Sequence, residues 1–80
     1  MKSVTVQYYA LFRETSGRSG EQIETNAATA EELYSELQSR YGFALTTAQV
    51  KVAINEEFGG WTTSLKDGDS IVFIPPVAGG

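Results

Sequence analysis

The sequence predicts an α+β fold in which a mixed β-sheet packs on one main helix. Three segments carry this prediction: an alternating segment at residues 3–9, a long amphipathic segment after Thr29, and an apolar run at residues 71–74. Alternation with a period of two is typical of a half-buried strand, whereas apolar residues three and four positions apart are typical of a helix. Several short strands covered by one helix make an α+β architecture.

The N-terminal part predicts a strand, a helical turn and a returning strand. Val4, Val6 and Tyr8 alternate with polar residues and define the inner face of the first strand. Residues 10–14 break this alternation and fit a helical turn, and the Gly-Arg-Ser-Gly stretch that starts at Gly17 has the composition of a turn. Residues 21–25 then form a second strand, which returns beside the first.

The main helix has signals at both ends. Thr29 and Glu32 form a capping box, in which the Thr29 hydroxyl accepts from the Glu32 amide and the Glu32 side chain reaches back. Gly42 supplies the C-terminal stop. The residues at helical spacing define one apolar face, namely Ala30, Leu33, Tyr34, Leu37 and Tyr41.

The C-terminal half predicts the remaining strands. Residues 50–54 alternate as a third strand, residues 55–57 form a turn, and residues 58–61 form a short edge piece. Residues 66–69 are a strong turn signal before the last strand at residues 70–74. This last strand is apolar on both faces, which predicts a central strand covered on both sides. If it lies parallel to the first strand, the fold is a β-grasp, or ubiquitin-like, roll.

Composition excludes several classes of function. The 80 residues contain no cysteine and no histidine, which removes thiolate nucleophiles, disulfides and the usual ligands of zinc. A net charge of −4 argues against nucleic acid and against anionic membranes. No segment resembles a signal peptide or a membrane span. We therefore expect one cytoplasmic domain, residues 1–80, that binds no metal.

The C-terminal segment ends in two glycines. Pro75 and Pro76 end sheet pairing because neither has an N–H group to donate, and Val77, Ala78, Gly79 and Gly80 follow. A tail without side chains at its tip can enter a narrow slot, where the Gly80 carboxylate would be the reactive group. We expect residues 75–80 to form a flexible tail that reaches up to roughly 20 Å. The alternative is a frayed end without function.

Several of these segments are similar to one family. The segments Ala53-Ile54-Asn55, Leu65-Lys66-Asp67-Gly68-Asp69 and Ile71 to Gly80 resemble the small subunits of molybdopterin synthase, and so does Phe12-Arg13-Glu14 with Gly17. These proteins belong with the ubiquitin-like sulfur carriers that end in Gly-Gly. The resemblance spans essentially the whole chain, and the tail with paired prolines is its specific part.

The resemblance implies a route for sulfur and a set of partners. An E1-like enzyme would use ATP and Mg²⁺ to adenylate Gly80, and a sulfur donor would convert it to a thiocarboxylate. The charged carrier would dock on a large catalytic subunit in a heterotetramer and insert Pro75, Pro76, Val77, Ala78 and Gly79 with Gly80 into its active site. Sulfur would then pass to a cyclic pterin monophosphate to build the molybdopterin dithiolene, while the carrier itself binds no cofactor and has no activity alone.

Two side chains are candidates for the docking surface. Tyr9 lies on the face opposite Val4, and Ile74 lies on the face opposite Phe73, so adjacent first and last strands would place them, with Val77, near the root of the tail. The alternative is that they are scattered surface residues. For the other conspicuous residues we favour a structural interpretation: a solvated helical turn for Arg13 and Glu14, a turn for Asp67 and Asp69, packing for Trp61, and a solvated face for Glu31, Glu32 and Glu36.

Three other functions remain open at the level of sequence. The chain could carry sulfur for another pathway, such as thiamine thiazole synthesis. It could be a ubiquitin-like modifier that is attached to lysines through the same adenylated terminus. It could also be an interaction module whose tail is inert.

Overall fold

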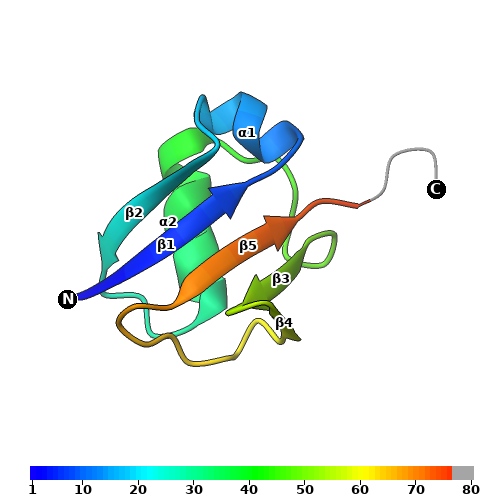
Figure 1. Cartoon of the computed structure of the whole chain (residues 1–80). Helices are drawn as coiled ribbons and strands as arrows, with labels where there is room; N and C mark the ends of the chain where they lie inside the picture. Colours follow the sequence, from blue (N-terminus) through cyan, green and yellow to red (C-terminus); the bar gives the residue numbers. More distant parts are fainter. Residues whose placement is uncertain (77–80) are drawn as a thin grey trace.

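The structure is a computed structural model that describes residues 1–76, and these residues form a sheet layer and a helix layer (Figure 1). The elements in chain order are β1 (Lys2–Tyr8), α1 (Leu11–Ser16), β2 (Gly20–Thr25), α2 (Ala30–Tyr41), β3 (Lys51–Ile54), β4 (Glu57–Gly59) and β5 (Ser70–Ile74). The five strands make one mixed sheet in the order β2-β1-β5-β3-β4. This arrangement confirms the predicted α+β class.

The first and last strands lie side by side in the middle of the sheet. β1 and β5 are parallel, with Val6 opposite Ile71 and Tyr8 opposite Phe73. β2 and β3 then pair antiparallel with β1 and β5, and β4 forms one edge. The predicted position of β5 at the centre of the sheet is therefore confirmed. The long chain between β1 and β5 supplies the crossover that parallel pairing requires.

The limits of α2 follow from its caps. The Thr29 hydroxyl accepts from the Glu32 amide at 3.3 Å, as the sequence predicts. The Glu32 carboxylate reaches back one residue further than a standard capping box, because it accepts from the amide of Ala28 at 3.3 Å. Gly42 ends the helix with a φ of 77°, the left-handed conformation that glycine adopts without strain.

An aromatic cluster fills the space between α2 and the sheet. Phe12 and Phe43 are the members that the sequence pattern did not single out, and their ring centroids lie 4.9 Å apart, edge to face. Trp61 is half-buried and stacks on Phe73, and its indole N–H donates to the carbonyl of Thr47, so its predicted packing role is confirmed. The short helix α1 therefore serves to insert Phe12, which is fully buried.

The prediction that both faces of β5 are covered is wrong. Ile71 and Phe73 are fully buried beneath α2, but Val72 and Ile74 on the opposite face are only half-buried. Figure 1 shows α2 behind the sheet and the front of the sheet free of helix. We call this second side, turned away from α2, the open face. An apolar pattern indicates which residues favour removal from water, but it does not say what covers them. The fold of the chain itself buries only one face of this strand.

Side chains of Asn55 and Asp69 hold the turns that precede β5. Asn55 and Glu56 have φ values of 53° and 71° and form a two-residue hairpin turn, so β4 already begins at Glu57. The side-chain Nδ2 of Asn55 donates to Asp69 Oδ1 at 3.0 Å, and its side-chain Oδ1 accepts from the backbone amide of Ser70 at 3.0 Å. These bonds hold the start of β5 against the hairpin.

The two aspartates of the second turn have structural partners as well. Asp67 Oδ1 accepts from the Ser3 amide at 2.7 Å, and Asp69 Oδ2 accepts from the Lys66 amide at 2.8 Å. Their predicted role in a turn is confirmed, and the turn ties β5 to β1. In residues 1–76, neither helix is long and apolar enough to cross a membrane.

Candidate functional site: the tail root and the open face

The central strand leads directly into the C-terminal segment. β5 ends at Ile74, and Pro75 and Pro76 follow outside any strand. The four last residues of the predicted site, Val77, Ala78, Gly79 and Gly80, lie outside the described residues. The structure therefore fixes the point from which the tail starts, at the end of the strand that is hydrogen-bonded on both sides.

Tyr9 lies on the open face beside this point. β1 ends at Tyr8, and Tyr9 follows with half of its surface exposed (50%). Its hydroxyl donates to Gln7 Oε1 at 3.1 Å, and Gln7 stands opposite Val72 of β5. Because Tyr8 pairs with Phe73, the next residues on the two strands, Tyr9 and Ile74, reach the same end of the sheet. The predicted juxtaposition is thus present, and its role in docking stays a prediction.

Phe58 is the residue that sequence reasoning missed. It lies in the middle of β4 and is 74% exposed, an unusual state for a large aromatic side chain. It pairs with Ala53, which in turn pairs with Val72, so these three side chains share the open face. The signal was present in the sequence, because a two-residue turn at Asn55-Glu56 sets Phe58 opposite Ala53.

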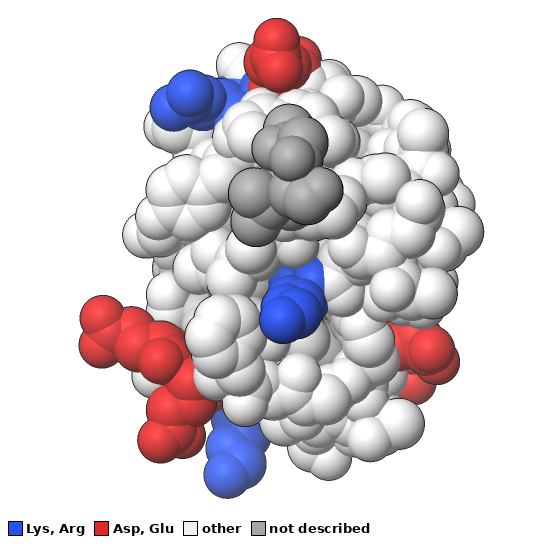
Figure 2. Space-filling model, turned by 90° about the vertical axis from the view of Figure 1, so that its right-hand side faces the viewer, with Lys and Arg blue, Asp and Glu red and all other residues white. Residues whose placement is uncertain are grey.

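The charged groups are distributed unevenly around this region. Lys51, at the start of β3, is exposed and stands opposite Ile74 on the open face. Figure 2 views the molecule from the end at which β5 finishes and shows a largely uncharged surface, with acidic and basic groups at its margin and a basic group near its centre. A low density of charged side chains is typical of the core of a protein interface.

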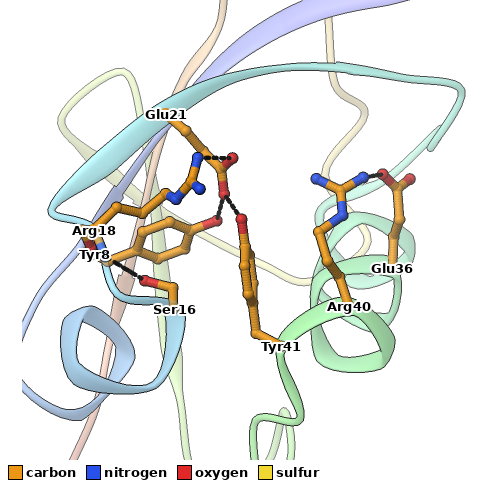
Figure 3. Close-up of polar contacts among 7 residues, drawn as sticks. All are labelled: Tyr8, Ser16, Arg18, Glu21, Glu36, Arg40 and Tyr41. Atoms are coloured by element: carbon orange, nitrogen blue, oxygen red, sulfur yellow. Dashed lines mark hydrogen bonds and ion pairs between the residues drawn. The ribbon is translucent and has the colours of Figure 1, made fainter.

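A partly buried carboxylate, that of Glu21, holds the same strand end on the side that faces α2 (Figure 3). Glu21 Oε2 accepts from the Tyr8 hydroxyl at 2.6 Å and from the Tyr41 hydroxyl, while Arg18 pairs with Oε1 at 3.2 Å. Burial alone would raise the pKa of Glu21, but the two phenols, Arg18 and Arg40 outweigh it and hold that pKa below its usual range.

The same contacts raise the pKa of both phenols. Burial, followed by the hydrogen bond to Glu21, raises the pKa of Tyr8 and that of Tyr41. Glu21 therefore stays ionised and both tyrosines stay protonated near neutral pH, so the cluster has no proton to exchange in a reaction. It joins β1, β2 and α2 and holds the end of β1, from which Tyr9 projects.

The remaining polar candidates are engaged in structure or exposed. Arg13 and Glu14 on α1 are exposed, as predicted for a solvated helical turn. On the outer side of α2, Glu31 and Glu32 are exposed, whereas Glu36 is half-buried and accepts from the Thr25 hydroxyl at 2.7 Å. The remaining candidate feature of the described residues is therefore the apolar surface on the open face.

These features define a class of protein: a ubiquitin-like β-grasp domain whose central strand continues into a C-terminal Gly-Gly segment. The chain belongs to the ThiS family, whose profile matches residues 6–80. It is 35% identical over 80 residues to the molybdopterin synthase sulfur carrier subunit of Haemophilus influenzae, covering 96% of this chain and 99% of that protein. The protein of the same name from Mycobacterium tuberculosis is also 35% identical, over 83 residues and 100% of each chain.

Solved structures agree with this assignment. A Pyrococcus furiosus protein assigned as subunit 1 of molybdopterin converting factor has a TM-score of 0.80 and 31% identity, over 96% of this chain and 100% of that one. The complex of subunits 1 and 2 of the molybdopterin-converting factor from Helicobacter pylori contains a chain with a TM-score of 0.68 and 29% identity, over 98% of this chain and 99% of that one. The predicted family and fold are both confirmed.

Proposed function

We propose that this chain is the sulfur carrier subunit of a molybdopterin synthase and that Gly80 carries the sulfur as a thiocarboxylate. The observation that supports this most strongly is the likeness to sulfur carrier subunits along the full chain, together with the Gly-Gly end that follows the central strand. The carrier has no activity alone. Its fold presents one carbonyl carbon to partners that perform the chemistry.

The carboxylate of Gly80 needs activation from outside. An α-carboxyl group has a reference pKa of about 3.3–3.7 and is an anion at neutral pH, which makes it a poor electrophile. In the proposed route an E1-like enzyme holds ATP and Mg²⁺, the carboxylate attacks the α-phosphorus, and pyrophosphate leaves. A sulfur donor then displaces AMP. The chain has no cysteine to carry a persulfide, so the acyl carbon is the available carrier.

The Gly80 thiocarboxylate is then used by a second partner, the large catalytic subunit. The large catalytic subunit binds a cyclic pterin monophosphate, and the thiocarboxylate delivers its sulfur there. A dithiolene contains two sulfur atoms, so two charged carriers are consumed for each molybdopterin. This stoichiometry suits a heterotetramer in which two carriers serve two large subunits.

The open face is the proposed docking surface for the large subunit. Tyr9, Ile74 and Phe58 present apolar surface on the side of the sheet that α2 leaves uncovered. Aromatic side chains near the centre of an interface contribute a large share of binding energy. With this face seated on the partner, the C-terminal segment, residues 75–80, enters the active site. We place the complex in the cytoplasm, where ATP and the activating enzyme act on it.

Deletion of Gly80 tests the proposal. The variant is combined with the large subunit, the activating enzyme, ATP, a sulfur donor and the pterin precursor, and the molybdopterin formed is measured. We expect no product, with a thermal unfolding midpoint equal to that of the wild type. A chain extended by one alanine after Gly80 should also be inactive, whereas deletion of the exposed Met1 should be harmless. Product formation by the Gly80 deletion would overturn the mechanism.

A further inference from the structure

We propose that Lys51 makes the open face selective for a partner surface that carries an acidic group opposite it. This inference rests on the proposed function, because it takes the large subunit as the protein that covers this face. It adds to that function the sign of the charge on the partner's contact surface, and it names Lys51 as the residue that recognises this charge.

Lys51 lies on the open face beside an apolar residue of the central strand. Lys51 opens β3 directly opposite Ile74, the last residue of β5. Successive strand residues alternate between faces, so the buried Val52 points toward α2 while Lys51 and Ala53 share the open face. Lys51 is therefore a neighbour of the strand end from which the tail starts.

Within residues 1–76, Lys51 takes part in no ion pair. Two basic side chains of the described residues are paired, Arg18 with Glu21 and Arg40 with Glu36, and Lys51 takes part in neither ion pair. Glu56 lies beyond the opposite end of β3, and the acidic side of α2 lies behind the sheet (Figure 1). Lys51 is exposed, in a chain with ten acidic and six basic residues, so its ammonium group is accessible to an acidic group of a partner that covers the open face.

Docking changes the environment of that lysine. A partner that covers Ile74 and Val72 also removes water from the neighbouring ammonium group, and an ammonium group without a counterion in such a place is costly. A carboxylate on the partner offsets this cost and fixes the register of the two surfaces. A partner with a neutral or basic surface is disfavoured at the same position. The acidic contact thus selects the partner as well as strengthening its binding.

Charge reversal with a matched control tests the inference. The dissociation constant for the large subunit from the same organism is measured by titration calorimetry at low and at high salt. Lys51→Glu should weaken binding at low salt by about tenfold or more, and the loss should shrink at high salt. Lys66→Glu makes the same change of charge in the exposed turn that precedes β5, at the opposite end of that strand from Ile74, and should change binding less than about twofold. Lys51→Arg should bind like the wild type.

The outcomes separate this inference from the function on which it rests. Equal binding by Lys51→Glu and Lys66→Glu, with both variants folded by thermal unfolding, would overturn the acidic contact and leave the proposed function standing. A Lys51→Arg variant as weak as Lys51→Glu would overturn it too, because the charge would not be the property recognised. A wild-type chain that fails to bind the large subunit would overturn the proposed function, and this inference with it.

Discussion

Replacement of Phe58 by alanine should weaken docking of the large subunit strongly while leaving the fold nearly unchanged. Phe58 is 74% exposed, so the folded monomer gains little from its ring. Surface substitutions of this kind usually change the free energy of unfolding by no more than about 0.5 kcal/mol. Phe12 is the contrasting case, because it is fully buried and its replacement by alanine should cost about 3–5 kcal/mol of stability.

The size of the binding effect follows from the exposed area. A phenylalanine buries about 150–250 Å² when it is fully covered, and most of that area is still in contact with water here. If docking covers it, truncation to alanine removes on the order of 100 Å² of apolar contact, which corresponds to about 2–3 kcal/mol at roughly 25 cal/mol per Å². The dissociation constant should therefore rise by roughly 30- to 150-fold.

Titration calorimetry with the large subunit measures this change, and thermal unfolding of the free variant checks the fold. Glu57→Ala is the matched control, because it lies on the same strand but pairs with Ile54, on the face turned toward α2. We expect it to bind like the wild type. Wild-type affinity in Phe58→Ala would show that the partner does not cover the open face at β4 and would refute the docking surface proposed here.

Three further results are expected. Ile74→Lys should reduce the free energy of binding to the large subunit by more than it reduces the free energy of unfolding, since Ile74 is only half-buried. Equal losses of the two free energies would place Ile74 in the core. Glu21→Gln should destabilise the fold by about 1–3 kcal/mol at neutral pH. Because the pKa of Glu21 is lowered by folding, this difference should fade as the pH falls below about 4, and a difference independent of pH in urea titrations would contradict the role of the charge. Asn55→Ala should lower the free energy of unfolding by about 2–3 kcal/mol, because two hydrogen bonds are lost and alanine is strained at a left-handed φ. Asn55→Gly should recover the part of this loss that is due to backbone strain. Unchanged stability in both variants would refute the role of these hydrogen bonds in holding β5 against the hairpin.

Much of the fold could be predicted because its signals are local. The caps at Thr29 and Gly42 depend on residues within one turn of α2, and the alternation at Val4 and Val6 depends on one strand. The pairing of β1 with β5 is not local, and the length of the connection between them was consistent with a parallel arrangement without establishing it. Phe12 escaped prediction because a single buried residue on a six-residue helix has no periodicity to reveal it.

The candidate site could be predicted only in part for a related reason. Tyr9 and Ile74 were found because their strands are long enough to show which face each residue takes. Phe58 lies on a three-residue strand, and its face is set by pairing with Ala53 rather than by its own pattern. The second apolar face of β5 was assigned to the interior because hydrophobicity does not distinguish burial by the chain itself from burial by a partner.

The chemical state of Gly80 in cells is the most direct test of sulfur carriage. The protein is purified from its native host without added thiols, and its intact mass is measured together with that of its C-terminal peptide. We expect a fraction in which one oxygen of the Gly80 carboxylate is replaced by sulfur, and this fraction should disappear when the activating enzyme is removed. Conjugates to other proteins in its place, or an unmodified Gly80 even when activating enzyme, ATP and a sulfur donor are supplied, would contradict the proposed function.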